Sequence, residues 1–314
     1  MKAAVVSSFD SAPQYADFAE PVAQNDNEQV VDMIAAGLHP RVRSQANGSH
    51  YTSTGALPLV PGIDGVGRTA DGTLHYFILP DTTFGTMAER TVVDVRRSIA
   101  LPADSDPLAV AAALNPAMSS WVALRRRVRF EAGANVLVLG ATGSAGRMAV
   151  QIAKHLGANR IVAAARDTAK LPALTPLGAT DLVGLHDADA IGKAAADVDV
   201  VIDYVWGEPT ATAMTAIITA RPDRGAPLSW IQIGSVAGAT APIPSAALRA
   251  ARLQIVGSGQ GSVSTREILG ELPELAAEIT KGTFDIDARP VPLSQVEQAW
   301  AEAPRTAQRL VITP

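Results

Sequence analysis

Cysteine is absent from this chain of 314 residues. Its absence excludes disulfides, thiolate nucleophiles and every zinc site built on cysteine. The histidines offer no substitute, because no two of them have the spacing of a metal-ligand pair. They are His39, His50, His75, His155 and His186. We therefore expect a protein that holds no metal ion.

The chain also lacks long apolar runs and export signals. Its start, MKAAVV, has no signal-peptide core, and no apolar run looks long enough to span a bilayer. The net charge of −5 argues against a general nucleic-acid binder. Four nearby arginines, Arg125, Arg126, Arg127 and Arg129, fit the polar face of a helix. We expect a soluble, cytoplasmic protein that binds neither nucleic acid nor membrane.

The segment from Asn135 to Lys170 organises the rest of the chain. Its apolar run 136–139 is typical of a strand buried on both faces. A glycine-rich turn follows, then a helical stripe of apolar residues that ends near Leu156, and then a second apolar run at 160–165. Strand, glycine turn, helix and strand form the first unit of a dinucleotide-binding fold.

Three glycines at a spacing of three residues give this turn its properties. Gly140 permits a backbone conformation that a Cβ would disfavour. Gly143 lets the main chain approach a pyrophosphate, and Gly146 lets the helix pack on the strand. The N–H groups from Ser144 to Gly146 would then face the phosphates. The spacing GxxGxxG is related to GxGxxG, and the alternative is a tight turn without a ligand.

The end of the second strand selects the cofactor. A carboxylate there favours NAD, whereas cations favour the 2′-phosphate of NADP. Arg166 and Lys170 could flank one phosphate, and we favour NADP(H). Asp167 could serve as the acid of an NAD site, or it could cap the helix that begins near Thr168. Arg166 and Lys170 could also be solvated surface charges.

The flanking regions have different patterns. Residues 1 to about 115 contain short apolar runs separated by turn residues, as in an antiparallel barrel. Helices are predicted at 107–114 and 116–128, with a break at Asn115-Pro116. Strands and helices alternate up to residue 256, which indicates a doubly wound parallel sheet. A closing strand at 309–312 most simply returns to the first domain.

In order along the chain, several stretches together resemble the medium-chain dehydrogenase/reductase superfamily, in its zinc-independent quinone oxidoreductase and alkenal reductase branch. They are AAGLHP at 35–40, VPGIDGVGRT at 60–69, GTMAERTVV at 85–93, AAALNPAMSSW at 111–121, the glycine segment and VVIDYVWG at 200–207. The resemblance implies an α/β protein with a GroES-like β-barrel domain, 1–117 with 263–314. It also implies a Rossmann doubly wound parallel-sheet domain, 118–262, and a cofactor between the two.

The resemblance also implies which residues line the cofactor. The pyrophosphate would lie against the glycine turn, Ser119 would approach the nicotinamide, and two later segments would flank the nicotinamide and its ribose. The residues carried over are Gly140, Thr142, Gly143, Ser144, Ala145, Gly146 and Arg147 for the turn, and Gly234, Ser235, Gly257, Ser258 and Gly259 for the later segments.

Chemistry without a metal relies on hydrogen-bond donors, which polarise a substrate more weakly than zinc does. That favours acceptors that are already electrophilic, and we predict NADPH-dependent reduction of a quinone or an α,β-unsaturated carbonyl. His39, Tyr51 and Ser119 are the candidate catalytic donors. His39 could instead be structural, Tyr51 could be an exposed loop residue, and solvent could supply the proton.

The sequence also bears on a second enzyme family, on a non-catalytic function and on assembly. A short-chain dehydrogenase would need a Tyr-xxx-Lys pair, but Glu208 stands at that offset from Tyr204. A non-catalytic NADPH-binding sensor or scaffold on the same fold is the alternative function. Relatives commonly pair Rossmann sheets edge to edge, and the strands near 229–233 and 253–256 could do so here to form a homodimer.

Overall fold

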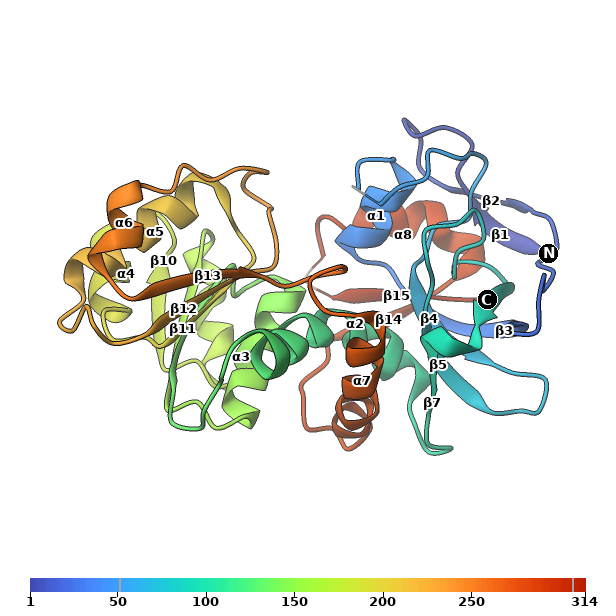
Figure 1. Cartoon of the computed structure of the whole chain (residues 1–314). Coiled ribbons are helices and arrows are strands. Elements are labelled where there is room, and N and C mark those ends of the chain that lie inside the picture. Colours follow the sequence, from blue (N-terminus) through green and yellow to red (C-terminus); the bar gives the residue numbers. More distant parts are fainter. Residues whose placement is uncertain (51, 307) are drawn as a thin grey trace. The chain divides into compact units, whose positions relative to one another are not determined.

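The structure is a computed structural model that describes residues 1–50, 52–306 and 308–314 (Figure 1). It divides into two compact units. The first comprises Met1–Asn115 and Leu269–Pro314, and the second comprises Pro116–Ile268. The residues expected to end and resume the first domain, 117 and 263, lie two and six positions from these bounds (115 and 269). Tyr51, one of the candidate donors, lies outside the described residues.

The first unit is built on a largely antiparallel sheet with the order β14-β15-β3-β4-β5-β7, in which β6 also pairs with β3. The strands of the sheet are β3 (Glu28–Gly37), β4 (Asp64–Arg68), β5 (Leu74–Ile78), β6 (Arg90–Asp94), β7 (Ser98–Ala100), β14 (Ala288–Pro292) and β15 (Arg309–Thr313). β15 pairs with β3 through Val311 opposite Gly37, so the closing strand does return to this unit.

The remaining elements of the first unit surround that sheet. β1 (Lys2–Val5) and β2 (Gln14–Asp17) form a separate antiparallel pair. The helices are α1 (Pro40–Ala46), the 3₁₀ turn η1 (Val95–Arg97), most of α7 (Thr265–Thr280), η4 (Leu293–Gln295) and α8 (Val296–Glu302). α1 begins at Pro40, directly after His39, because proline is well suited to the first turn of a helix.

The second unit holds a parallel sheet of six strands with the order β10-β9-β8-β11-β12-β13. Counted from β8, this is the order 3-2-1-4-5-6 of the Rossmann fold, which confirms the predicted doubly wound sheet. Its strands are β8 (Asn135–Leu139), β9 (Arg160–Ala165), β10 (Asp181–Gly184), β11 (Val200–Asp203), β12 (Leu228–Gln232) and β13 (Leu253–Gly257). The strand order reverses between β8 and β11.

Helices connect the strands of the second unit. They are α3 (Ser144–His155), η3 (Thr168–Leu174), α4 (Ala188–Ala194), α5 (Gly207–Ala220) and α6 (Ser245–Ala250). All four residues of β11 are buried, as are 136–139 of β8, which agrees with strands covered on both faces. The sheet has β13 at one edge and β12 in its interior, so the prediction that the segment 229–233 could offer a free edge is wrong.

α2 (Pro107–Val122) corrects two further predictions. It runs through Pro116, although a break was expected there, because buried contacts of Leu114, Ala117 and Trp121 outweigh one lost backbone bond. It continues into the π-helical turn η2 (Ala123–Arg127). The joined helix of 21 residues is long and apolar enough to cross a membrane, contrary to expectation; however, 67% of its most apolar window is buried inside the protein, as in a core helix.

Candidate functional site

The glycine turn lies at the carboxyl end of β8, and its three glycines differ in what the fold demands of them. Gly140 has φ +84°, a region that favours glycine. A Cβ on Gly146 would lie 2.3 Å from the Gly140 carbonyl oxygen, so the packing of α3 on β8 requires glycine there. Gly143 has φ −73°, and a Cβ on it would meet only the Gly140 oxygen, at an ordinary 3.5 Å.

Gly143 is therefore the glycine of the three that neither φ nor packing requires. It is the N-cap residue of α3, and no side chain caps this helix. The first N–H groups of a helix have no partner within it and attract anions. A residue without a side chain at this point leaves the backbone open to a bulky anionic ligand. The residues predicted for the pyrophosphate thus fit a phosphate group.

A hollow of about 660 Å³ opens at the carboxyl ends of β9 and β10. Arg166 lines it together with Thr168, Gly184, Leu185, His186, Asp187, Ala188 and Asp189. The carboxylate of Asp187 caps α4 by accepting from the Ala190 N–H at 2.9 Å. Arg166 is the one arginine or lysine among the residues that line this hollow.

Asp167, which follows Arg166 in the chain, forms an ion pair with Lys170. Asp167 accepts from the Ala169 N–H at 3.2 Å, so it caps η3, which is one of the two roles predicted for it. Lys170 Nζ lies 3.3 Å from Asp167 Oδ2, and both side chains are exposed. Lys170 does not line the hollow with Arg166.

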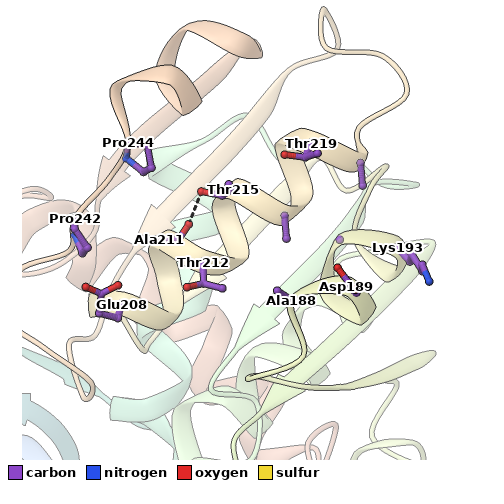
Figure 2. A pocket seen from close by; sticks show the side chains of 13 residues that line it. Ala188, Asp189, Lys193, Glu208, Ala211, Thr212, Thr215, Thr219, Pro242 and Pro244 are labelled. Carbon is purple, nitrogen blue, oxygen red and sulfur yellow. Dashed lines mark hydrogen bonds between the residues drawn. The ribbon is translucent and has the colours of Figure 1, made fainter.

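A different hollow, of about 640 Å³, lies on α4, α5 and the segment around Pro242 (Figure 2). Threonine side chains at 212, 215 and 219 of α5 line it, and the Thr215 hydroxyl is turned back to the Ala211 carbonyl oxygen at 2.9 Å. None of the predicted site residues that the structure describes lines this hollow.

Ser119 has a partner that the sequence did not reveal. Its Oγ lies 2.7 Å from the Pro116 carbonyl oxygen and 2.8 Å from the Tyr204 hydroxyl. Burial raises the pKa of Tyr204 to about 12, although hydrogen bonds with Ser119 and Ser120 act in the opposite direction. Tyr204 is thus a neutral hydrogen-bonding group. Tyr204 directly follows β11. Sequence analysis examines this tyrosine only as a member of a Tyr-xxx-Lys pair.

The later predicted segments flank the same edge of the sheet. Gly234 follows β12, and a Cβ on it would lie 2.6 Å from the Tyr204 carbonyl oxygen. Gly257 ends β13, and its carbonyl oxygen accepts from Arg127 Nε at 2.8 Å. A Cβ on Gly257 or Gly259 would have nothing within 4 Å, so packing within the protein does not require glycine at either position.

The turn after β11 has an unusual backbone. Trp206 has φ +57° and ψ −170°, a conformation found almost only in glycine, and among the described residues it is the one non-glycine with positive φ. Such a conformation costs on the order of 1–3 kcal/mol. The buried carboxylate of Asp203 holds the turn by accepting from the N–H groups of Val205 and Trp206, at 2.8 and 3.0 Å.

In the first unit, His39 is buried against Asp64. His39 Nε2 lies 2.8 Å from Asp64 Oδ1, and the Tyr76 hydroxyl donates to Asp64 Oδ2 at 2.9 Å. Burial, and then the Asp64 carboxylate, raise the pKa of Tyr76 well above 10. Burial lowers the pKa of Arg309 to about 10, while Asp64 opposes that shift. Sequence analysis predicts a role for His39 but none for Asp64, which it treats only as part of the glycine-rich stretch 60–69.

Comparison with known proteins agrees with this architecture. A family model described as "Zinc-binding dehydrogenase" matches residues 145–278. The chain is 30% identical, over the full length of both proteins, to a probable NADPH-dependent quinone reductase of Emericella nidulans. It is 29% identical to an NADPH-dependent alkenal/one oxidoreductase of Arabidopsis thaliana, over 57% of this chain and 50% of that protein.

Solved structures agree in fold. The quinone oxidoreductase of Thermus thermophilus, also solved with NADPH, has a TM-score of 0.84 at 24% identity, with both chains fully covered. The chain belongs to the quinone oxidoreductase branch of the medium-chain dehydrogenase/reductase superfamily and is an oxidoreductase. Among the described residues, no cluster of three or more histidine, aspartate or glutamate side chains could hold a metal ion.

Proposed function

We propose that this enzyme uses NADPH to reduce a quinone or an α,β-unsaturated carbonyl by hydride transfer, without zinc. A relative that the alignment covers over its full length is named as a probable NADPH-dependent quinone reductase, which supports this assignment. The structural observation that carries it is Gly143, which stands at the open start of α3 after a parallel strand and whose own packing would accept a Cβ. The lack of cysteine supports a mechanism without the usual zinc ligands.

In this proposal, each predicted cofactor residue has a distinct task. The backbone from Thr142 to Arg147 would hold the pyrophosphate, and Arg166 would recognise the 2′-phosphate through its planar guanidinium. Ser119, with Tyr204 behind it, would contact the nicotinamide side, as would the segments 234–235 and 257–259. The cofactor supplies the hydride; the protein supplies orientation and hydrogen bonds.

His39 would act on the oxygen of the acceptor. Because its Nε2 is engaged by Asp64, only Nδ1 can face a substrate. In the doubly protonated form Nδ1 donates, and the Asp64 carboxylate stabilises the positive charge of that form. Tyr51 stays in the proposal as a second donor.

Alanine substitution of two glycines in the same turn tests cofactor binding. Gly143→Ala should leave the melting temperature nearly unchanged, because its φ and its surroundings accept a Cβ. It should weaken NADPH binding by about tenfold or more, since the Cβ would occupy space needed by the pyrophosphate. Gly146→Ala is the matched control for packing, and it should lower the melting temperature. Unchanged NADPH affinity in folded Gly143→Ala would contradict the proposal.

Substrate class and assembly need separate measurements. Steady-state oxidation of NADPH with a quinone and an enone side by side distinguishes the two chemistries, and tight NADPH binding without turnover would favour a sensor. We also propose a cytoplasmic homodimer that pairs through β13, one of the two edge strands of its sheet. A monomeric mass in light scattering would contradict the dimer.

A further inference from the structure

Trp206 combines a large side chain with a backbone conformation that glycine would adopt more easily. It also occupies the N-cap position of α5, yet it makes no side-chain cap, whereas serine, threonine, aspartate or asparagine would cap the helix. Neither the turn nor the helix start therefore favours tryptophan. A bulky residue retained in a strained conformation is a reason to look for a function of its side chain.

Buried hydrogen bonds hold Trp206 in this conformation. Asp203 is fully buried, and its Oδ1 accepts both backbone N–H groups of the turn. Its Oδ2 is fixed by Thr210 Oγ1 at 2.7 Å and Trp230 Nε1 at 2.9 Å. The carboxylate cannot shift to relax the turn without losing those partners. Trp206 is consequently held in one place and presented on a rigid support.

The place is the point where the strand order of the parallel sheet reverses. Trp206 follows β11, whose neighbour β8 ends in the glycine turn, and ligands of such sheets bind outside this point. A Cβ on Gly140 would lie 3.3 Å from Val205, next to Trp206 in the chain. Tyr204, two residues before Trp206, is hydrogen-bonded to Ser119. Trp206 therefore directly follows two residues, Tyr204 and Val205, that lie against Ser119 and the glycine turn.

Exposure separates Trp206 from the other tryptophans. Trp121 and Trp230 are fully buried and Trp300 is 8% exposed, whereas Trp206 is partly exposed. We propose that the Trp206 indole is the stacking wall for the acceptor, a planar conjugated ring such as a quinone. This inference rests on the proposed function and names the residue that selects among its substrates.

The chemistry of the rings favours the acceptor over the cofactor as the partner of Trp206. Indole has an electron-rich face, and it stacks best on an electron-poor ring. A quinone is electron-poor, whereas the reduced nicotinamide is electron-rich. The residues proposed to touch the nicotinamide, at 119, 234–235 and 257–259, are small and admit the cofactor ring closely. A large flat side chain from the same edge of the sheet suits a second ring.

A substitution series separates stacking from strain. Trp206→Phe keeps an aromatic ring, whereas Trp206→Ala and Trp206→Gly remove it. With 2-methyl-1,4-naphthoquinone, the last two variants should raise KM about tenfold, and Trp206→Phe less than about threefold. KM for but-3-en-2-one and the Kd of NADPH should change less than about threefold in all three. Trp206→Gly should melt above Trp206→Ala, because only glycine relieves the backbone.

Several results would overturn this inference. One is an unchanged KM for the naphthoquinone in Trp206→Ala and Trp206→Gly. Another is an equal loss for both acceptors, or activity that follows the melting temperature, since either indicates a structural role. A change confined to the Kd of NADPH would place the cofactor, not the acceptor, on the indole.

Fluorescence measures the stacking without turnover. In the presence of NADP⁺, the naphthoquinone should quench the tryptophan emission of the wild type and of the control Trp300→Phe, but not that of Trp206→Phe. Quenching that survives in Trp206→Phe contradicts the inference. A wild type that reduces neither acceptor defeats the proposed function, and quenching then still decides whether Trp206 binds a planar ring.

Discussion

Asp64 in the first unit and Asp203 in the second are both fully buried aspartates, and both oxygens of each carboxylate are hydrogen-bonded. The partners differ in kind. Asp64 faces His39 and Tyr76, two side chains that can gain or lose a proton. Asp203 faces two backbone N–H groups, a threonine hydroxyl and the Trp230 indole, whose hydrogens do not titrate in the range of protein stability.

This difference shows how one residue type supports two purposes. A buried carboxylate is costly unless it is hydrogen-bonded, so both sites must be complete. At Asp203 the hydrogen bonds only fix a geometry, namely the strained turn that carries Trp206. At Asp64 the partners include the His39 imidazole, the side chain proposed to act on the acceptor. The first arrangement fixes geometry and the second can take part in chemistry.

The largest effect is expected for Asp203→Ala. The substitution leaves the buried donors of Thr210 and Trp230 without a partner and releases the turn at Trp206. Each unsatisfied buried donor costs about 1–3 kcal/mol, so the free energy of unfolding should fall by roughly 3–5 kcal/mol. Urea denaturation measures this loss, with the exposed Asp189→Asn as a control within about 0.5 kcal/mol. A loss below about 1 kcal/mol would show that Asp203 does not hold the turn.

Alkaline pH tests the tyrosines of the two regions. Burial raises the pKa of Tyr204 to about 12, and burial with Asp64 raises that of Tyr76 well above 10. An unfolded tyrosine loses its proton near pH 10, so each raised pKa contributes stability that is complete below pH 10 and is lost as pH rises through the folded pKa. For Tyr204 the loss between pH 10 and 12 amounts to roughly 2–3 kcal/mol.

Phenylalanine variants show how much of the alkaline loss of stability comes from each tyrosine. Tyr76→Phe and Tyr204→Phe should each reduce the fall in unfolding free energy between pH 9 and pH 11.5, as followed by urea denaturation at each pH. The two reductions should be similar in size, because both folded pKa values lie well above 10 and the loss in this window comes mainly from the unfolded phenols. If both variants retained the full alkaline loss of the wild type, the raised pKa values of the two phenols would not contribute to the stability of the protein.

Much of the architecture follows from local sequence. The apolar runs and the glycine turn predict β8, α3 and β9 because buried parallel strands and helix starts leave strong local signals. The strand order does not follow from these local signals, although right-handed crossovers limit the possible orders. α2 escapes such reasoning, since proline suggests a break that tertiary packing overrides. The edge position of β13 likewise depends on the whole sheet.

The candidate site was predictable only where single residues carry a backbone requirement. Gly140 and Gly146 belong to that class. The pairing of His39 with Asp64 spans 25 residues, and that of Ser119 with Tyr204 spans 85, so no local pattern joins them. Trp206 left no signal, because a tryptophan with positive φ contradicts the propensity on which sequence reasoning relies.

The smallest effect concerns the chemistry proposed for Asp64. His39→Gln removes the titrating ring but keeps a side chain able to bond Asp64, and it should lower kcat for quinone reduction by about tenfold, or ~1.4 kcal/mol of barrier. Asp64→Asn should lower kcat similarly, and the double variant should lose little more, because both changes disable one unit. Tyr76→Phe is the matched control, since it removes the other partner of the same carboxylate and should leave kcat within about twofold. Stopped-flow oxidation of NADPH measures each rate. Additive losses in the double variant, or an equal loss in Tyr76→Phe, would assign Asp64 the same shape-holding role as Asp203.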